Sequence, residues 1–175
     1  MQAAFILGRR GLDNVNCSRN DLCYGQKKKG KDGYMAIKVD LEKAYDRLEW
    51  SFIHKVLQAF HFPQHFTKFI TSCVSTTSIS ILVNGSKMDS FIPSRGIKQG
   101  DPLSPYLFIL CVEFLTHLIE GKCVDGSWIP LKASRGNIRI SHLIFADDLI
   151  LFAKVMEEAY EAISEVMQVF CSKSG

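Results

Sequence analysis

Two adjacent carboxylates, Asp147 and Asp148, stand inside the apolar stretch HLIFADDLILFAK at residues 142–154. Like charges beside a packed sheet repel each other and lose solvation, so the pair costs free energy unless something compensates it. One interpretation is a polar hairpin tip that stays in water. The other is a cation site, because a divalent ion removes the repulsion. The pair alone does not decide between them.

A third carboxylate, Asp40, closes the β-prone stretch YMAIKVDL at residues 34–41. An Asp in this place also suits the N-cap of a following helix, and the sequence leaves that alternative open. If the strand shares a sheet with the Asp147–Asp148 hairpin, three carboxylates converge, with no cationic side chain expected nearby. Such an oxygen-rich site suits Mg²⁺. Two ions there can activate a 3′-hydroxyl and stabilise a leaving pyrophosphate, which is polymerase chemistry.

The segment PSRGIKQGDPLSPYLF at residues 93–108 forms a second candidate site. Arg95, Lys98 and Gln99 lie beside two glycines, where the backbone can approach a ligand closely and basic groups can meet phosphates. The alternative is a turn that leads into the next helix. That alternative explains the Asp-Pro and Ser-Pro pairs but not the three polar side chains.

Size and composition indicate a globular chain. Its 175 residues are 47% hydrophobic, enough for one domain, or a large part of one, with a substantial core, which excludes a disordered protein. The net charge of +3 permits a polyanionic partner without requiring one. Lysines gather in GQKKKGKDG at residues 25–33, where Lys27 to Lys31 form either a solvated loop or a contact for phosphates.

The six cysteines form no CxxC pair and no zinc-like cluster. Cys73, Cys111 and Cys171 have apolar neighbours, so we expect reduced core thiols and an intracellular location. No signal peptide is expected at the start. The longest apolar run, residues 106–119, contains Glu113 and is too short for a bilayer, so we expect a buried helix and no membrane partner.

The hydrophobic pattern predicts an α+β fold. The expected order is strand, two helices, hairpin, helix, hairpin and helix, which indicates an antiparallel sheet with helices packed on one face. Asn84-Gly85 is the strongest hairpin signal. The long apolar helix should begin at Ser104 and end near Gly121. The residues expected on buried helix faces are Phe52, Ile53, Val56, Leu57 and Phe60; Phe66, Phe69, Ile70, Cys73 and Val74; and Tyr160, Ile163, Val166, Met167 and Phe170.

Three motifs in order, IKVDLEKAYDRLEW, PSRGIKQGDPLSPYLF and FADD, resemble the reverse transcriptase domain of plant LINE-type (non-LTR) retrotransposons. The resemblance runs from residue 2 to the end, and the opening QAAFILGRRGLDN is similar to the family's fingers segment. It implies a polymerase palm over residues 34–175 with fingers-derived segments, a fingers remnant at residues 1–33, and no thumb. Group II intron and telomerase-like enzymes share the acidic triad, but AYDRLEW and GIKQGDPLSPYLF favour the LINE type.

The resemblance implies roles for individual residues. Asp40 matches the first metal-binding aspartate, with the Leu41 carbonyl as an extra ligand. Asp147 and Asp148 match the acidic pair, of which Asp147 is the more certain ligand. Tyr45 matches the aromatic residue that lies under the incoming sugar and hinders a 2′-hydroxyl, although a purely packed aromatic is the alternative. Gln99 and Gly100 match the loop that touches the incoming nucleotide and the template, and the implied nucleic-acid contacts are Arg95, Lys98, Arg9 and Arg10.

The implied function is RNA-directed DNA polymerisation. The partners would be an RNA template, a DNA primer and deoxynucleoside triphosphates, with two Mg²⁺ ions, or Mn²⁺ in their place. The family implies a nuclear location. Because the endonuclease, primer grip and thumb regions of a longer polyprotein are missing, we expect this stretch to be inactive by itself. The alternative function is a noncatalytic remnant that binds nucleic acid through the Lys27 to Lys31 loop and the Arg95 loop.

Overall fold

The computed structural model describes residues 33–132 and 138–175, and they form two compact units. The first contains the described residues up to Glu42 and Val112–Phe170, and the second contains Lys43–Cys111 and Cys171–Gly175.

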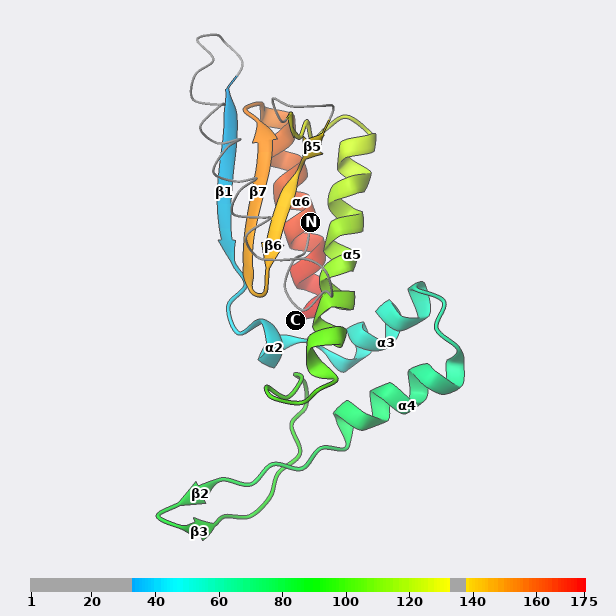
Figure 1. Cartoon of the computed structure of the whole chain (residues 1–175), viewed down its shortest axis with the longest axis vertical. Coiled ribbons are helices and arrows are strands. Elements are labelled where there is room, and N and C mark those ends of the chain that lie inside the picture. Colours follow the sequence, from blue (N-terminus) through cyan, green and yellow to red (C-terminus); the bar gives the residue numbers. More distant parts are fainter. Residues whose placement is uncertain (1–32, 133–137) are drawn as a thin grey trace. The chain divides into compact units, whose positions relative to one another are not determined.

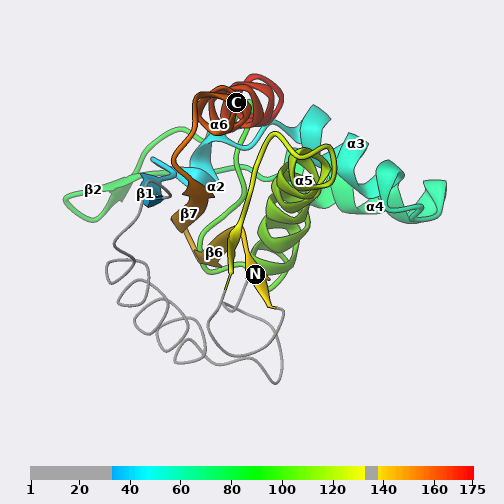
Figure 2. The same ribbon diagram turned by 90° about the horizontal axis from the view of Figure 1, so that it is seen from above.

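A three-stranded antiparallel sheet forms the first unit, in the order β1 (Tyr34–Asp40), β7 (Asp148–Lys154) and β6 (His142–Phe145). Strands β1 and β7 pair along their whole length. Two helices, α5 (Ser104–Val124) and α6 (Glu157–Ser174), extend into this unit, and their parts within it lie on one face of the sheet, as Figures 1 and 2 show. The predicted α+β class, an antiparallel sheet with helices on one face, is therefore confirmed.

The two faces of this sheet differ. Side chains alternate between the faces along each strand, and one face of β7 carries the fully buried Leu149, Leu151 and Ala153. The opposite face is covered at one end by the hairpin β4 (Leu131–Lys132) and β5 (Arg139–Ile140), through an apolar cluster of Leu131, Ile140, Leu143 and Phe152. The other end of that face is open to solvent and carries Lys38, Asp40, Phe145 and Asp148.

Helix α5 begins at Ser104 as predicted but continues past Gly121 to Val124. A glycine costs only about 1 kcal/mol relative to alanine inside a helix, so Gly121 does not end it. The predicted burial of this apolar segment is right for Leu107, Phe108, Cys111, Val112, Leu115 and Ile119. No helix in the described ranges, α5 included, combines the length and hydropathy needed to cross a membrane.

Helix α6 corrects one prediction about the core. Ile163, Val166 and Phe170 are buried as expected, but Tyr160 is 67% exposed. The buried stripe instead includes Ala159 and Ala162, with 0% and 3% exposure. Small alanines let a helix lie close to its neighbours, and a search for large apolar side chains passes over them.

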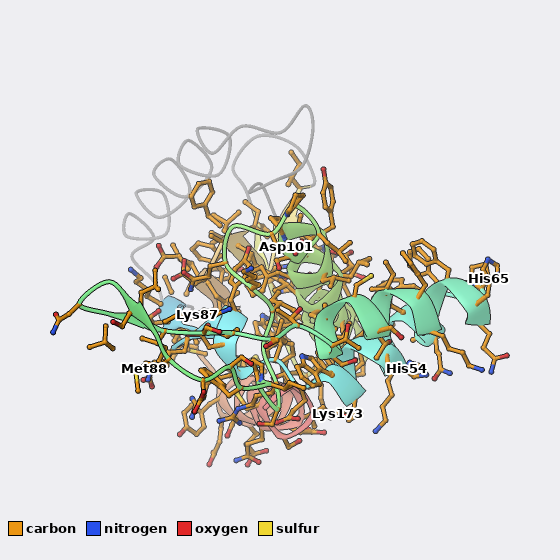
Figure 3. The ribbon with its side chains drawn as sticks, turned by 90° about the horizontal axis from the view of Figure 1, so that it is seen from below. His54, His65, Lys87, Met88, Asp101 and Lys173 are labelled. Atoms are coloured by element: carbon orange, nitrogen blue, oxygen red, sulfur yellow. The ribbon has the colours of Figure 1, made fainter. Side chains whose placement is uncertain are left out.

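The second unit contains α2 (Ala44–Arg47), α3 (Trp50–Ala59), α4 (Gln64–Ser75) and a hairpin of β2 (Leu82–Val83) and β3 (Ser86–Lys87). Helix α3 buries Phe52, Ile53, Val56 and Leu57, as predicted. The predicted hairpin turn is confirmed, because Asn84 and Gly85 have φ values of 49° and 82°. Figure 1 shows this hairpin extending away from α3 and α4, and Figure 3 labels Lys87 and Met88 on it.

The predicted buried stripe of α4 is wrong for Phe66, Phe69 and Cys73, which are exposed. The buried residues of this helix are Thr67 and Ile70. A hydrogen bond of 3.2 Å between His54 Nδ1 and Thr71 Oγ1 joins α3 to the same side of α4. The buried stripe is thus partly polar, and for this reason the hydrophobic pattern of the sequence did not predict it. Of the cysteines predicted to be core thiols, Cys111 is buried, while Cys73 and Cys171 are exposed.

Candidate active site

The open end of the sheet in the first unit brings three predicted site residues together. Asp40 is the last residue of β1 and lies directly opposite Asp148, the first residue of β7. Directly opposed residues of an antiparallel pair share one face, with Cβ atoms about 5 Å apart. Asp147 precedes Asp148 in the turn, and its main-chain carbonyl accepts a hydrogen bond from the Leu41 N–H at 3.3 Å. We call Asp40, Asp147 and Asp148 the acidic edge.

The apolar neighbours of the acidic edge hold the β6–β7 hairpin in place. Leu143, Ile144 and Leu149 flank the turn and are buried, Ile144 and Leu149 completely. The two-residue turn places Ala146 at a left-handed φ of 53°, which costs a residue other than glycine about 1 kcal/mol. Burial of the flanking side chains outweighs this strain. The turn thus presents its carboxylates to solvent from a rigid base.

The structure shows whether Asp40 caps a helix, and it places Asp147 and Asp148 in different parts of the hairpin. Asp40 does not cap the next helix, because the N-cap of α2 is Lys43 and no side chain makes a cap hydrogen bond there. Asp147 does lie at the tip of the hairpin, as the polar-turn interpretation says. Asp148 belongs to the strand, opposite Asp40. The two adjacent aspartates therefore have different places: Asp147 lies in the turn, and Asp148 pairs with Asp40 at the strand ends.

The expectation that no cation lies near these carboxylates is wrong. Lys38 Nζ lies 2.9 Å from Asp148 Oδ1, and the two side chains are 68% and 54% exposed. Lys38 stands two residues before Asp40 in β1, so both point to the same face. The hydrogen bond to Asp148 raises the pKa of Lys38, and the negative charges of Asp40 and Asp147 act in the same direction. Because side chains alternate along a strand, the sequence itself could have predicted that Lys38 lies beside Asp40.

The residue types of the acidic edge fit a hard divalent cation, since all the donors are oxygen atoms on a solvent-open surface. Their present arrangement is less complete. Within residues 33–132 and 138–175, no three His, Cys, Asp or Glu side chains are placed to share one ion. Asp148 is instead paired with Lys38. The backbone therefore brings the donors side by side, and the side chains would have to rotate to share an ion.

The segment before α5, in the second unit, is fixed to α2 and α3 through its main chain. Trp50 Nε1 donates a hydrogen bond to the Gly96 carbonyl at 2.7 Å, and the Gly96 N–H donates to the Leu48 carbonyl at 2.8 Å. Gly96 has a φ of 91°, and a Cβ there would lie 2.8 Å from the Asp46 carbonyl oxygen. Only glycine fits this close approach. The conformation of this loop is thus fixed by specific contacts to α3 and to the residues around α2.

A pocket of about 440 Å³ opens beside this loop. This volume is within the range of small-molecule sites. Trp50, Ile79 and Phe91 contribute apolar surface, and three predicted nucleic-acid or nucleotide contacts line it as well: Arg95, Lys98 and Gln99. Asp101, labelled in Figure 3, also lines the pocket, and its carboxylate accepts the Leu103 N–H at 2.8 Å. Sequence reasoning missed Trp50 and Phe91, because nothing local signals that α3 and the hairpin meet the loop.

Arg95 and Tyr45, two predicted site residues of the second unit, each contact another side chain of that unit. The guanidinium of Arg95 lies 3.6 Å from the Glu49 carboxylate, and the two side chains are 48% and 40% exposed. The ring of Tyr45 stacks on Phe108, with ring centres 4.8 Å apart and planes 18° from parallel. Tyr45 is therefore a packed aromatic in this structure, while its half-exposed position leaves the nucleotide role a prediction.

The predicted site residues lie in different parts of the chain. Asp40, Asp147 and Asp148 belong to the first unit, and the predicted nucleotide and nucleic-acid contacts from Tyr45 to Gly100 belong to the second. Arg9, Arg10 and the lysines at 27–31 lie outside the described residues. The roles assigned to all of these residues stay predictions.

Comparison with protein families gives a match over almost the whole chain. The family model described as reverse transcriptase (RNA-dependent DNA polymerase) matches residues 2–175. The Pol polyprotein of the type-2 retrotransposable element R2DM from Drosophila melanogaster is 34% identical over 116 residues, which are 66% of this chain and 10% of that protein. An uncharacterised mitochondrial protein of Arabidopsis thaliana, AtMg01250, is 48% identical over 67 residues, or 38% of this chain and 55% of that protein.

Solved structures give the same fold. Telomerase from Candida tropicalis in complex with the TWJ fragment of telomeric RNA matches with a TM-score of 0.64 and 15% identity. The match covers 98% of this chain and 28% of the telomerase chain. The chain thus spans about a tenth of the Drosophila polyprotein and under a third of the telomerase.

Proposed function

The chain belongs to the reverse transcriptase (RNA-dependent DNA polymerase) family, of the kind found in non-LTR retrotransposons, and from this premise we propose that its acidic edge is the catalytic centre of an RNA-directed DNA polymerase. The observation that supports the proposal is the register that sets Asp40 opposite Asp148 with Asp147 in the adjoining turn. Within this family, an exposed carboxylate group held on a rigid hairpin suits nucleotidyl transfer.

Asp40, Asp147 and Asp148, with the Leu41 carbonyl, are the proposed ligands of Mg²⁺ or Mn²⁺. Bound divalent ions supply activation of the primer 3′-hydroxyl and stabilisation of the departing pyrophosphate. The chain's own contribution is position. The β1–β7 pairing fixes Asp40 against Asp148, and the buried flanks of the hairpin keep Asp147 at the open end of the face.

The second unit is proposed to meet the nucleotide and the template. Gln99 and Gly100 would touch the incoming nucleotide, and Tyr45 would hinder a 2′-hydroxyl. Support comes from the pocket beside the loop and from the rigid attachment of Gly96, which holds the neighbouring polar side chains in place. The proposed contacts to nucleic acid are Arg95, Lys98, Arg9 and Arg10.

We also propose the finer assignments that the sequence suggested. The chain is taken as a palm over residues 34–175 with a fingers remnant at 1–33, from a plant LINE-type element that acts in the nucleus. The partners are an RNA template, a DNA primer and deoxynucleoside triphosphates, together with the endonuclease and thumb regions of a longer polyprotein.

The test is Mg²⁺-dependent primer extension on an RNA template, with this chain joined to the flanking regions of its polyprotein. Asp40→Asn and Asp148→Asn should each lower the rate at least about a hundredfold, because each removes a charge from the reacting centre. Asp89→Asn, at an exposed site on the β2–β3 segment, is the matched control and should leave the rate unchanged. Equal rates for Asp148→Asn and the control would contradict the catalytic role.

A second candidate is nucleic-acid binding without catalysis. The pairing of Asp148 with Lys38 favours it, since one proposed ligand already has a partner. Binding of RNA that weakens with rising salt, in a protein that incorporates no nucleotide, would support this candidate. Binding that is independent of ionic strength would contradict it.

A further inference from the structure

The Lys38–Asp148 ion pair crosses from one strand to the next. Lys38 lies opposite Ile150 in the β1–β7 register, and Asp148 is its diagonal neighbour on the same face. Asp40 is opposite Asp148 itself. Like charges that face each other directly across two strands destabilise the pair. The ammonium of Lys38, at 2.9 Å from Asp148, offsets that repulsion from within the chain.

Packing does not explain this lysine. Its side chain is 68% exposed, so it contributes little buried surface to the sheet. The described part of the first unit offers a comparison, the ion pair of Lys122 with Glu165, which joins α5 to α6. That pair links two helices, whereas Lys38 meets a carboxylate of the acidic edge. The position of Lys38 therefore has a consequence for whatever cation approaches the edge.

We propose that Lys38 is an internal counter-cation of the acidic edge, and that its ammonium competes with a divalent ion for the carboxylate of Asp148. The inference rests on the proposed function for the identity of the metal ligands. The ammonium on Oδ1 neutralises part of the charge of the Asp148 carboxylate and repels a divalent ion that approaches either of its oxygens, so the two cations compete for Asp148. Lys38 is thus a positioning residue: it holds Asp148 before an ion binds, and it weakens divalent-ion affinity by competition.

The competition has a measurable size. Lys38→Met removes the competitor and should tighten Mn²⁺ binding roughly two- to fivefold, the range expected for an exposed ion pair. Added monovalent salt should reduce the difference in Mn²⁺ affinity between Lys38→Met and the wild type, because it screens the charge of the ammonium. Lys38→Arg keeps both the charge and the pairing and should bind like the wild type.

The experiment is a Mn²⁺ titration of the 175-residue chain, followed by the electron paramagnetic resonance signal of the free ion. Lys122→Met is the matched control, since it breaks a lysine–carboxylate pair away from the acidic edge and should leave the affinity unchanged. In an Asp148→Asn background, Lys38→Met should no longer tighten binding, because the competing contact is already gone. A readout without activity keeps the test independent of polymerisation.

Thermal unfolding gives a second measurement on the same variants. In EDTA, Lys38→Met should melt below the wild type, since Asp40 and Asp148 then repel each other without a partner. Saturating Mg²⁺ should reduce that gap, because the ion replaces the ammonium. A gap that is the same in EDTA and in Mg²⁺ would overturn the proposal.

The failures of the two proposals can be told apart. If Asp40→Asn weakens Mn²⁺ binding but Lys38→Met leaves it unchanged or weaker, the counter-cation role of Lys38 is wrong and the metal site stands. If Asp40→Asn and the wild type bind Mn²⁺ alike, the acidic edge is not the metal site, and the competition falls with it.

Discussion

Among the residues that the structure describes, two hairpins have two-residue turns, and they are stabilised in opposite ways. The β2–β3 hairpin has the favoured Asn84-Gly85 turn, yet its arms are exposed, Leu82 by 70%. The β6–β7 hairpin has an unfavoured turn residue, Ala146 at a φ of 53°, but its arms are buried. The first is specified by turn chemistry and the second by burial of its arms. The hairpin that carries the carboxylates is thus the one that the core holds rigid.

The largest expected difference between the hairpins comes from removing a side chain in each. Leu149→Ala, at a fully buried position, should lower the free energy of unfolding by about 2 to 5 kcal/mol, because it leaves a cavity. Leu82→Ala should change it by less than about 0.5 kcal/mol. Urea unfolding followed by circular dichroism measures both. Similar losses for the two variants would contradict the distinction.

The buried end of β6 should also make stability depend on pH. Burial lowers the pKa of His142 to about 3, and its ring bonds to Thr116 Oγ1 at 3.3 Å. Below pH 6.5 the unfolded chain takes up a proton that the folded chain refuses. Stability from this group is therefore complete above pH 6.5 and falls by about 1.4 kcal/mol for each pH unit down to about 3.

Urea unfolding at pH 7.5 and 5.5 tests this pH dependence. His142→Gln should flatten the change between the two values, because glutamine does not titrate. His65→Gln, at an exposed position of α4 labelled in Figure 3, should leave it as in the wild type. An unaltered pH dependence in His142→Gln would rule out His142 as its source.

The smallest expected effects come from the turns themselves. Gly85→Ala should weaken the β2–β3 hairpin by about 1 kcal/mol, since alanine is strained at a φ of 82° while no atom crowds a Cβ there. Hydrogen exchange of the Met88 amide, which donates to the Ile81 carbonyl, reports that opening. Ala146→Gly should be close to neutral, because relief of strain offsets the greater freedom of the unfolded chain. A large gain from Ala146→Gly would mean that burial does not control this turn.

Much of the fold follows from local signals in the sequence. The strand ending at Asp40, the Asn84-Gly85 turn and the start of α5 at Ser104 each depend on neighbouring residues, and each is confirmed. The failures concern which side of a helix meets the protein. The stripe of α4 contains Thr67, and that of α6 contains alanines, so neither is marked by large apolar residues.

The candidate site was predictable to a similar extent. Pairing of the Asp40 strand with the Asp148 hairpin agrees with the sequence expectation. Lys38 was overlooked as a partner, although alternation along β1 places it beside Asp40 on the same face. The walls of the pocket, Trp50 and Phe91, lie 41 positions apart and meet only through the tertiary fold. Residue types alone do not specify such contacts.

Strands β1 and β7 pair at all seven of their positions, so their register fixes which residue of one strand lies opposite each residue of the other. A change in length at an exposed loop between Glu42 and Val112, such as the Asn84-Gly85 turn, leaves Asp40 opposite Asp148, because that pairing lies within β1 and β7. Deleting a single residue inside β1 would shift every side chain before it to the opposite face of the sheet. The acidic edge is therefore insensitive to insertions and deletions in exposed loops of the second unit and sensitive to any of them within the seven residues of β1.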